Sequence, residues 1–413
     1  MTKPMKPKKS PVKKFFKGLL IFVVALVALI YGGVFLGHRV FFKIPTSAQA
    51  TIPVLENGNL RLGAASHKQP TTTEDYIKVL AQQVKTYNQK LPELWPDNNM
   101  SNQWVVAQDI KTKKAWSISP AGKVTKVSQK KLDSYQVSAF AVNGGWSQID
   151  TPELSGAFLA IDPEALTNFY SFQRYEHLGT YDPFITYAHE LFHGILQEDW
   201  PTPQYLNAEK DERDEDTKAR RKRMLLQQQL ALAISEPQNQ DAHIKDALAT
   251  YQDYQQNDPK DFKATIYADR VEGSAYYYEF KASLYAGYPD QIKDEADVQA
   301  ALTLLLTDDN PAYRASGAIS EGYNVGAYAG ILLDRLAQAK GESPDLWKKT
   351  LAEKGESSPL TLLAEQYSGE SLPTPAKIPS EKQRQAWLAA ADDIQQRGGA
   401  AENLFSLFYG ILY

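Results

Sequence analysis

The chain has 413 residues, of which 43% are hydrophobic and 23% charged, so it can form two or three folded lobes and is too apolar for a disordered protein. Its net charge of −4 leaves no excess of basic charge to follow phosphates, which argues against a nucleic-acid partner. It has no cysteine, which excludes disulfides, thiolate metal sites and cysteine nucleophiles, so any metal must be held by nitrogen and oxygen ligands.

The N-terminus combines a lysine-rich tail, residues 1–17, with an uncharged apolar run at 18–37. The run is about long enough to cross a hydrocarbon core as a helix. By the positive-inside rule the tail stays in the cytoplasm. We therefore expect a single-pass anchor in a bacterial inner membrane, with the remaining chain in the periplasm. The alternatives are a signal peptide cleaved after Ala50, at Ala48-Gln49-Ala50, and a eukaryotic type II membrane protein.

Beyond the anchor, residues 38–70 mix Pro, Ser, Thr, Asn and Gly with little periodicity and predict a linker. A first lobe is expected over 71–200. It would begin with a helix over Thr73–Lys90, stopped by Leu91-Pro92. Short runs rich in β-branched and aromatic residues then predict a small antiparallel sheet, with strands near 104–107, 115–118, 123–125, 136–140 and 155–162.

The second predicted lobe, 201–413, is mostly helical, which makes the expected fold class α+β. Its charged stretch 209–223 pairs opposite charges four residues apart, as Asp216 and Arg220 do, and predicts a solvated helix face. Apolar residues at helical spacing predict helices at 224–234, 243–254, 262–285, 322–338, 360–367 and 383–396.

Residues 182–197 carry the motif most specific for chemistry. Asp182 is suited to cap a helix and Pro183 to occupy its first position. His189 and His193 are four residues apart, so both imidazoles project from one side and can share a tetrahedral Zn²⁺. The helix also has an apolar side that belongs in a core, formed by Phe184, Ile185, Ala188, Leu191, Phe192, Ile195 and Leu196.

Glu190, between the two histidines, is placed to take a proton from a water on the metal instead of binding the metal. The alternative is that two core or surface histidines flank a glutamate by coincidence. Because the chain has only six histidines, such a coincidence is rare. The motif therefore favours a hydrolytic metal site.

A catalytic zinc also needs a third protein ligand. The metzincin extension would require Gly and His where this chain has Leu196 and Asp199. Glu272 is the candidate, because the small residues Gly273, Ser274 and Ala275 after it would let its helix approach the metal helix closely. The alternative for Glu272 is an ordinary carboxylate on a helix surface.

These residues resemble the gluzincin metallopeptidases, whose third zinc ligand is a Glu on a second helix, often in a Glu-Gly-x-Ala-x-Tyr setting. The resemblance covers 182–197 and 262–285 and implies a zincin-like fold with Zn²⁺ on His189, His193 and Glu272. The Asn-Glu-x-x-Ser-Asp of thermolysin-like members and the Gly-x-Met-x-Asn of the aminopeptidase branch are both absent. Subfamily and cleavage mode, endopeptidase or exopeptidase, therefore stay open.

Three further residues are candidates near this site. Glu279 is placed to orient His189 or His193. Tyr323 could donate its hydroxyl to an oxyanion, as a Tyr or His does in gluzincins, or could only pack at the start of a helix. Glu212 follows His193 at the interval that the aminopeptidase branch uses for its third ligand. Its unbroken run of charged neighbours suits a solvated helix better than a packed metal site.

Together these features predict a membrane-anchored zinc metallopeptidase, with the metal between a sheet lobe and a helical lobe. A peptide or protein substrate would bind in extended form along an exposed edge strand, for which Ala157–Ile161 is the candidate. Two other functions remain open. One is a non-catalytic envelope protein that uses the zincin fold for binding or scaffolding. The other is a zinc hydrolase of a non-peptide amide.

Overall fold

The structure is a computed structural model that describes residues 54–63, 70, 72–142, 145–163, 176–201, 217–307 and 321–386. All of them belong to one compact unit, residues 51–396. The predicted basic tail and the anchor at 18–37 lie outside these ranges, as does most of the helix predicted at 383–396. Within the described ranges, no helix has both the length and the apolarity that a membrane span requires.

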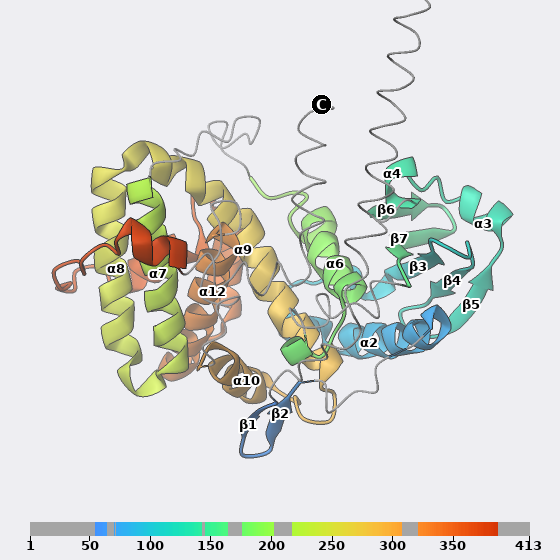
Figure 1. Ribbon diagram of the computed structural model, residues 1–413, viewed down its shortest axis with the longest axis horizontal. Coiled ribbons are helices and arrows are strands. Elements are labelled where there is room, and N and C mark those ends of the chain that lie inside the picture. The colour runs from blue at the N-terminus through green and yellow to red at the C-terminus, as the bar shows by residue number, and fades with distance from the viewer. Residues whose placement is uncertain are drawn as a thin grey trace, which may run out of the picture. The chain divides into compact units, whose positions relative to one another are not determined.

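The fold is α+β, with a small, mainly antiparallel sheet followed by a mostly helical region (Figure 1). The sheet has the order β5-β4-β3-β7-β6. Its strands, in chain order, are β3 Trp104–Asp109, β4 Ala115–Ile118, β5 Val124–Val127, β6 Trp146–Thr151 and β7 Leu154–Ile161. The side chains of β3, β4 and β7 alternate between two cores, so that Ala157 faces the main core and Phe158 a smaller one.

Three details of the predicted sheet were wrong. Strands β3 and β7 pair in parallel, so the sheet is mixed. β7 lies between β3 and β6, so Ala157–Ile161 is not an edge strand. The strand at that edge is β6, which was not predicted. The stretch 136–140 is not a strand either. Gln136 has a positive φ of 54°, and the Ser138 hydroxyl then accepts a hydrogen bond from the Ala141 N–H at the start of a short helix, α4 Ala139–Val142.

The predicted linker contains a two-stranded hairpin, which corrects the expectation for 38–70. Strands β1 Leu55–Asn57 and β2 Leu60–Leu62 are joined at Gly58, whose φ of +59° suits a two-residue hairpin turn. Leu60 and Leu62 are buried, and the Gly63 N–H donates to the Tyr288 hydroxyl at 2.9 Å. The hairpin is therefore part of the folded unit.

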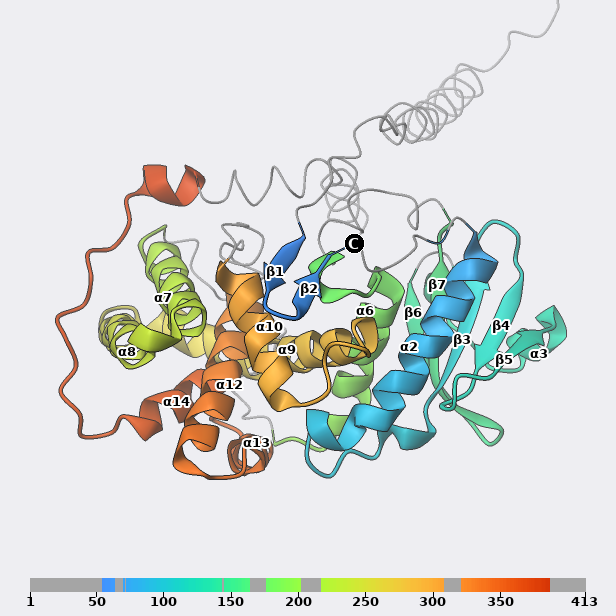
Figure 2. The same cartoon turned by 90° about the horizontal axis from the view of Figure 1, so that it is seen from below.

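The first long helix, α2 Thr73–Leu94, lies against one face of the sheet (Figure 2). The Thr72 hydroxyl caps it by accepting from the Asp75 N–H at 3.1 Å. The predicted stop at Leu91-Pro92 was wrong, because Pro92 is accommodated inside the last turn. On the other face of the sheet, α3 Gln129–Asp133 follows β5.

The helical region is built around α9 Pro259–Gly287, which packs against α12 Glu321–Lys340, α2 and the metal-motif helix α6 Asp182–Leu191. Figure 1 shows α6 between the sheet and α9. Most predicted helices are present, several of them longer than expected. Other helices in the described ranges are α7 Thr217–Ser235, α8 Gln240–Asn257, α10 Glu295–Thr307, α13 Asp345–Glu353 and α14 Pro359–Gln366.

Helices α9 and α12 cross with almost no space between their backbones. A Cβ built on Gly273 would lie 2.5 Å from the Gly326 Cα, and one on Gly326 would lie 2.2 Å from the Asp269 carbonyl oxygen. The prediction that small residues after Glu272 admit the metal helix was therefore wrong for Gly273, which instead admits α12. This contact places the first turn of α12 beside Glu272.

A buried ion network joins α7 to the same two helices. Arg220 pairs with Asp261 and Glu321, and Arg223 pairs with Asp269 and Glu321. The charge pattern had predicted a solvated face for this stretch, which is wrong for Arg220, because its side chain is buried. Removing one partner would leave a buried charge uncompensated, which typically costs about 3–5 kcal/mol. The network fixes α12 against α9 next to the candidate metal site.

Candidate metal centre

The metal-motif helix begins at Asp182, with Tyr181 as its N-cap. The Tyr181 carbonyl accepts from the N–H groups of Phe184 and Ile185 at 2.9 and 3.1 Å. Asp182 is thus the first helical residue and Pro183 the second, one position later than predicted. After Leu191 the helix widens into a π-turn, Phe192–Leu196, which contains His193. Such turns occur often at functional sites.

The structure brings His189, His193 and Glu272 together. The Nε2 atoms of the two histidines are 3.0 Å apart. Glu272 Oε2 lies 3.4 Å from His189 Nε2 and 3.3 Å from His193 Nε2. Ligand atoms at 2.0–2.1 Å from a tetrahedral zinc ion lie roughly 3.3 Å from one another. The three donor atoms therefore fit the face of such a site, and nitrogen and oxygen donors suit Zn²⁺.

Hydrogen bonds to the other ring nitrogens direct both Nε2 atoms at this point. His189 Nδ1 lies 3.1 Å from Glu279 Oε2, and a carboxylate accepts, so Nδ1 carries the hydrogen. Glu279 thus contacts His189, one of the two histidines that it was expected to orient. His189 Nε2 is therefore the ring nitrogen that faces the other two donor atoms and would bind a metal.

Gln197, which the sequence analysis did not single out, does the same for His193. Its Nε2 lies 2.9 Å from the Val271 carbonyl oxygen, which can only accept, so the amide NH₂ must face α9. Its Oε1 therefore faces His193 Nδ1, at 2.6 Å, and accepts from it. Gln197 also donates to the Ser274 hydroxyl at 2.9 Å. The signal available in the sequence was a Gln four residues after the second histidine, on the same side of the helix.

Burial and charge set the proton affinities in this cluster. Burial alone disfavours the charged form of His189, but hydrogen bonds and charges from Glu272 and Glu279 outweigh it and raise the pKa of His189 to about 10. Burial also acts to raise the pKa of Glu272, but hydrogen bonds with both histidines hold it well below its usual range. The cluster is therefore built to hold positive charge between the imidazoles.

Glu190 is half-buried beside these residues. Burial raises the pKa of its carboxyl group, an effect that the nearby histidines oppose and Glu272 and Glu279 reinforce. A carboxylate with raised proton affinity suits a group that must first accept a proton and then return it.

Tyr323, on the first turn of α12, contacts two of the three candidate ligands. Its ring stacks on His189, with 5.8 Å between centroids and 10° between planes, and its hydroxyl hydrogen-bonds to Glu272. Burial, followed by the charge of Glu272, raises the pKa of Tyr323, so its hydroxyl stays protonated and able to donate. Tyr323 therefore contacts the candidate ligands from its position at the start of α12.

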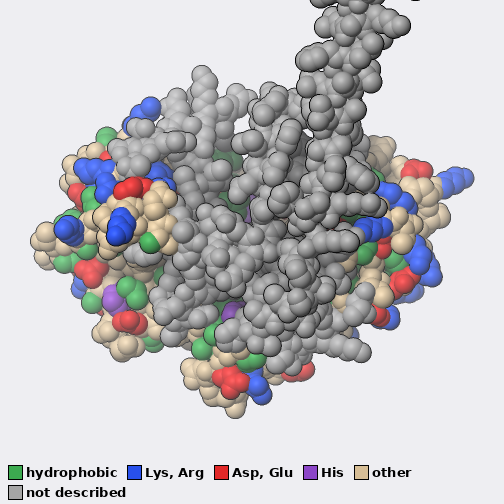
Figure 3. All heavy atoms as spheres, in the orientation of Figure 1, with side chains coloured by type: hydrophobic (Ala, Val, Ile, Leu, Met, Phe, Trp, Pro, Cys, Tyr) green, Lys and Arg blue, Asp and Glu red, His purple; other side chains and the backbone are tan. Residues whose placement is uncertain are grey.

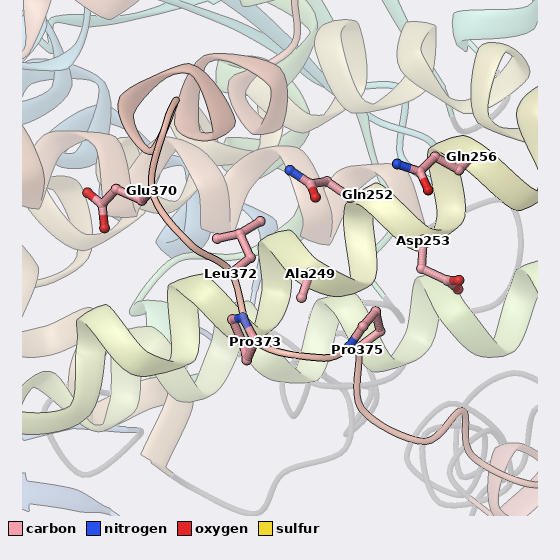
Figure 4. Close-up of a pocket in the computed structure, with 8 residues that line it drawn as sticks. All are labelled: Ala249, Gln252, Asp253, Gln256, Glu370, Leu372, Pro373 and Pro375. Atoms are coloured by element: carbon pink, nitrogen blue, oxygen red, sulfur yellow. The ribbon is translucent and has the colours of Figure 1, made fainter.

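The other predicted residue, Glu212, lies outside the described ranges. His177 is buried in a short 3₁₀ turn, Glu176–Leu178, and does not belong to the cluster. A surface pocket of about 300 Å³ lies elsewhere, between α8 and the segment 370–375 (Figure 4). No member of the metal cluster lines it.

Comparisons of this chain with models of protein families, with curated proteins and with solved structures find no match.

Proposed function

We propose that the chain is a membrane-anchored, zinc-dependent metallopeptidase of the gluzincin type. The observation that carries this proposal is the convergence of His189 Nε2, His193 Nε2 and Glu272 Oε2 within 3.4 Å of one another, with Glu190 beside them. The donor set fits Zn²⁺, because all three atoms are the nitrogen and oxygen types that zinc takes in hydrolases.

Bound at these three residues, zinc would supply Lewis acidity and lower the pKa of a water at its fourth position towards ~7. Glu190 takes the proton from the attacking water and later passes it to the leaving amine. The raised pKa of Glu190 supports both steps, because a more basic carboxylate accepts more readily and is still a competent acid afterwards. Tyr323 would donate its hydroxyl to the negative oxygen that develops on the substrate carbonyl.

An extended peptide substrate is best placed along β6, and this replaces the earlier choice of Ala157–Ile161. In the described part of the chain, β6 pairs with β7 alone, so the other edge of β6 can pair with a peptide strand. β6 also borders the metal helix: a Cβ built on Gly194, next to His193, would lie 2.8 Å from Gln148 Oε1. A peptide added there would run past the metal ligands.

Parallel digestion tests this function. The zinc-loaded protein is offered a peptide mixture and, separately, cell-wall fragments, each with and without a zinc chelator. We expect chelator-sensitive cleavage of peptides. Cleavage of the fragments alone would indicate a hydrolase of a non-peptide amide, and cleavage of neither would indicate a binding or scaffolding protein.

The membrane part of the proposal comes from residues 1–37, with their lysine-rich tail and uncharged apolar run. We propose a bacterial inner-membrane location with the catalytic part in the periplasm. Protease added to intact spheroplasts should then degrade the bulk of the chain, and survival of the full-length chain would reverse this topology.

A further inference from the structure

The hairpin at the outer edge of the sheet carries a concentration of positive charge that the proposed peptidase reaction does not use. Residues 110–131 contain seven lysines and no Asp or Glu, in a chain whose net charge is −4. They form the β3–β4 turn, β4, β5 and the start of α3. We call this segment the lysine hairpin. Its lysines are Lys111, Lys113, Lys114, Lys123, Lys126, Lys130 and Lys131.

The structure exposes this charge and leaves much of it unpaired. All seven lysines are exposed except Lys131, which is half-buried. Lys114 pairs with Glu74 and Lys131 with Glu153. Among the described residues, no ion pair involves the four lysines at the centre of this inference: Lys113, Lys123, Lys126 and Lys130. Figure 3 shows lysine and arginine side chains gathered at the edge where Figure 1 places β4, β5 and α3.

Neighbouring helix α2 extends the same surface. A Cβ built on Gly122, in the β4–β5 turn, would lie 3.0 Å from the Lys85 Cβ, so exposed Lys85 adjoins this turn. Lysines on the edge strand β5 would also prevent edge-to-edge aggregation. That purpose needs charge on the strand alone, whereas the lysines continue through both turns and into α3. The extent of the charge therefore indicates an anionic partner.

We propose that the lysine hairpin binds the anionic lipid headgroups of the membrane in which the chain is anchored. This inference rests on the anchor proposed at 18–37. The 16 residues between that run and the first described residue, Val54, span at most roughly 55 Å, which limits how far Val54 can lie from the membrane surface. Lipid phosphates offer many negative charges in one plane, which suits lysines spread over two turns and a strand. The sheet order places β5 at the opposite edge from β6, so membrane contact leaves the candidate metal site uncovered.

Lysine footprinting of the full chain in lipid nanodiscs tests the inference. One set of discs contains phosphatidylcholine alone, and the other contains a third of phosphatidylglycerol. An amine-acetylating reagent is applied, and modification of each lysine is followed by mass spectrometry. In the anionic discs we expect the four unpaired hairpin lysines to react at least about fivefold more slowly, an effect that high salt removes. The exposed lysines elsewhere should react equally in both: Lys260, Lys263, Lys349 and Lys382.

A pair of variants with equal charge change makes the test specific. Lys85, which adjoins the hairpin, should also be protected in the anionic discs. Replacing the four hairpin lysines by Gln should abolish the protection of Lys85, while replacing the four control lysines by Gln should preserve it. Equal reactivity of the hairpin in both kinds of disc overturns the inference. Protection that appears only when soluble polyphosphate is added also overturns it, because the hairpin would then bind an anionic polymer. Failure of the chain to enter the discs overturns it as well. Peptidase activity is not measured, so these outcomes are independent of the catalytic proposal.

Discussion

Gln197 determines, at the scale of single residues, which nitrogen of His193 is available to a metal. The Gln197→Leu variant removes the acceptor at His193 Nδ1 and the donor to the Val271 carbonyl. We expect zinc affinity to fall about 10- to 100-fold, as is usual when the hydrogen-bond partner of a ligating histidine is lost. Competition with a chromophoric chelator measures this.

The matched control is Gln197→Glu, which keeps an oxygen acceptor for His193 Nδ1 and loses only the donor to α9. It should retain most of the zinc affinity. If both variants bind zinc equally well, Gln197 does not orient His193.

Glu272 is the proposed third ligand, and Glu212 is its competitor by spacing. Glu272 Oε2 lies within 3.4 Å of both histidine Nε2 atoms. Glu272→Ala should therefore weaken zinc binding at least about tenfold. Glu212→Ala, with the same side-chain truncation, should leave it unchanged. The reverse pattern in measured zinc content and affinity would move the site to Glu212.

The pKa of about 10 for His189 links the stability of the metal-free protein to pH. Because this pKa is raised, the group stabilises the fold fully below its unfolded value of 6.5 and loses that contribution as pH rises towards 10. Between pH 6.5 and 8 the free energy of unfolding of the chelator-treated protein should therefore fall by roughly 1–2 kcal/mol. Lys348, whose pKa burial lowers to about 8, begins to contribute with opposite sign in the upper part of this window, which offsets a small part of the decrease.

Urea unfolding at the two pH values measures the change. The His189→Gln variant should lose the pH-dependent decrease, because it has no titrating imidazole at this position. If the free energy of unfolding falls equally in both proteins, His189 is not the source of the pH dependence.

At the scale of elements, the backbone contact between α9 and α12 brings Tyr323 to Glu272. Gly326→Ala places a Cβ 2.2 Å from the Asp269 carbonyl oxygen, so the helices must separate. We expect a net loss of roughly 1–3 kcal/mol in the free energy of unfolding, since overpacking outweighs the gain of at most about 1 kcal/mol in helix propensity. Zinc affinity should fall as well.

Gly330→Ala, one turn further along α12, is the control. Its Cβ would meet the Tyr277 ring at 3.0 Å, a side chain that can shift more easily than backbone. It should cost less stability and leave zinc binding intact. Equal effects of the two variants would mean that the close crossing does not support the site.

Local patterns predicted the elements that depend on neighbouring residues. The i,i+4 histidines and the apolar side of α6 follow from helical periodicity, and β3, β4 and β7 from short β-rich runs. The hairpin β1–β2 was missed although its two-residue turn, Gly58-Asn59, is a recognised hairpin signal, because its strands are only three residues long. β6 was missed because it is mixed in polarity and follows a region read as strand.

Properties that depend on distant segments could not be predicted in the same way. The parallel pairing of β3 with β7 joins residues about 50 positions apart, such as Val106 and Phe158, and periodicity carries no information on such partners. Glu272 was chosen because small residues follow it, yet Gly273 is small because of Gly326. Ser274, by contrast, contacts Gln197 at the end of the metal motif, so only part of the reason for selecting Glu272 belongs to a different helix.

At the scale of the whole molecule, the candidate site draws on segments that are far apart in the chain. α6 supplies His189 and Glu190, the π-turn that follows it supplies His193, α9 supplies Glu272 and Glu279, and α12 supplies Tyr323. The buried ion network between Arg220, Arg223 and the acidic residues of α9 and α12 holds two of these helices together. Because the site exists only in the folded chain, a metal that binds there also stabilises the fold.

The most direct test of the central claim compares the zinc-loaded protein with its Glu190→Gln variant, measuring zinc content and peptide turnover on the same samples. Glu190 is not one of the three converging donors, so the variant should still bind one zinc per chain. Turnover should fall by about two to four powers of ten, because the group that accepts and returns the proton is gone. Near-normal turnover in a zinc-loaded Glu190→Gln variant would contradict the account.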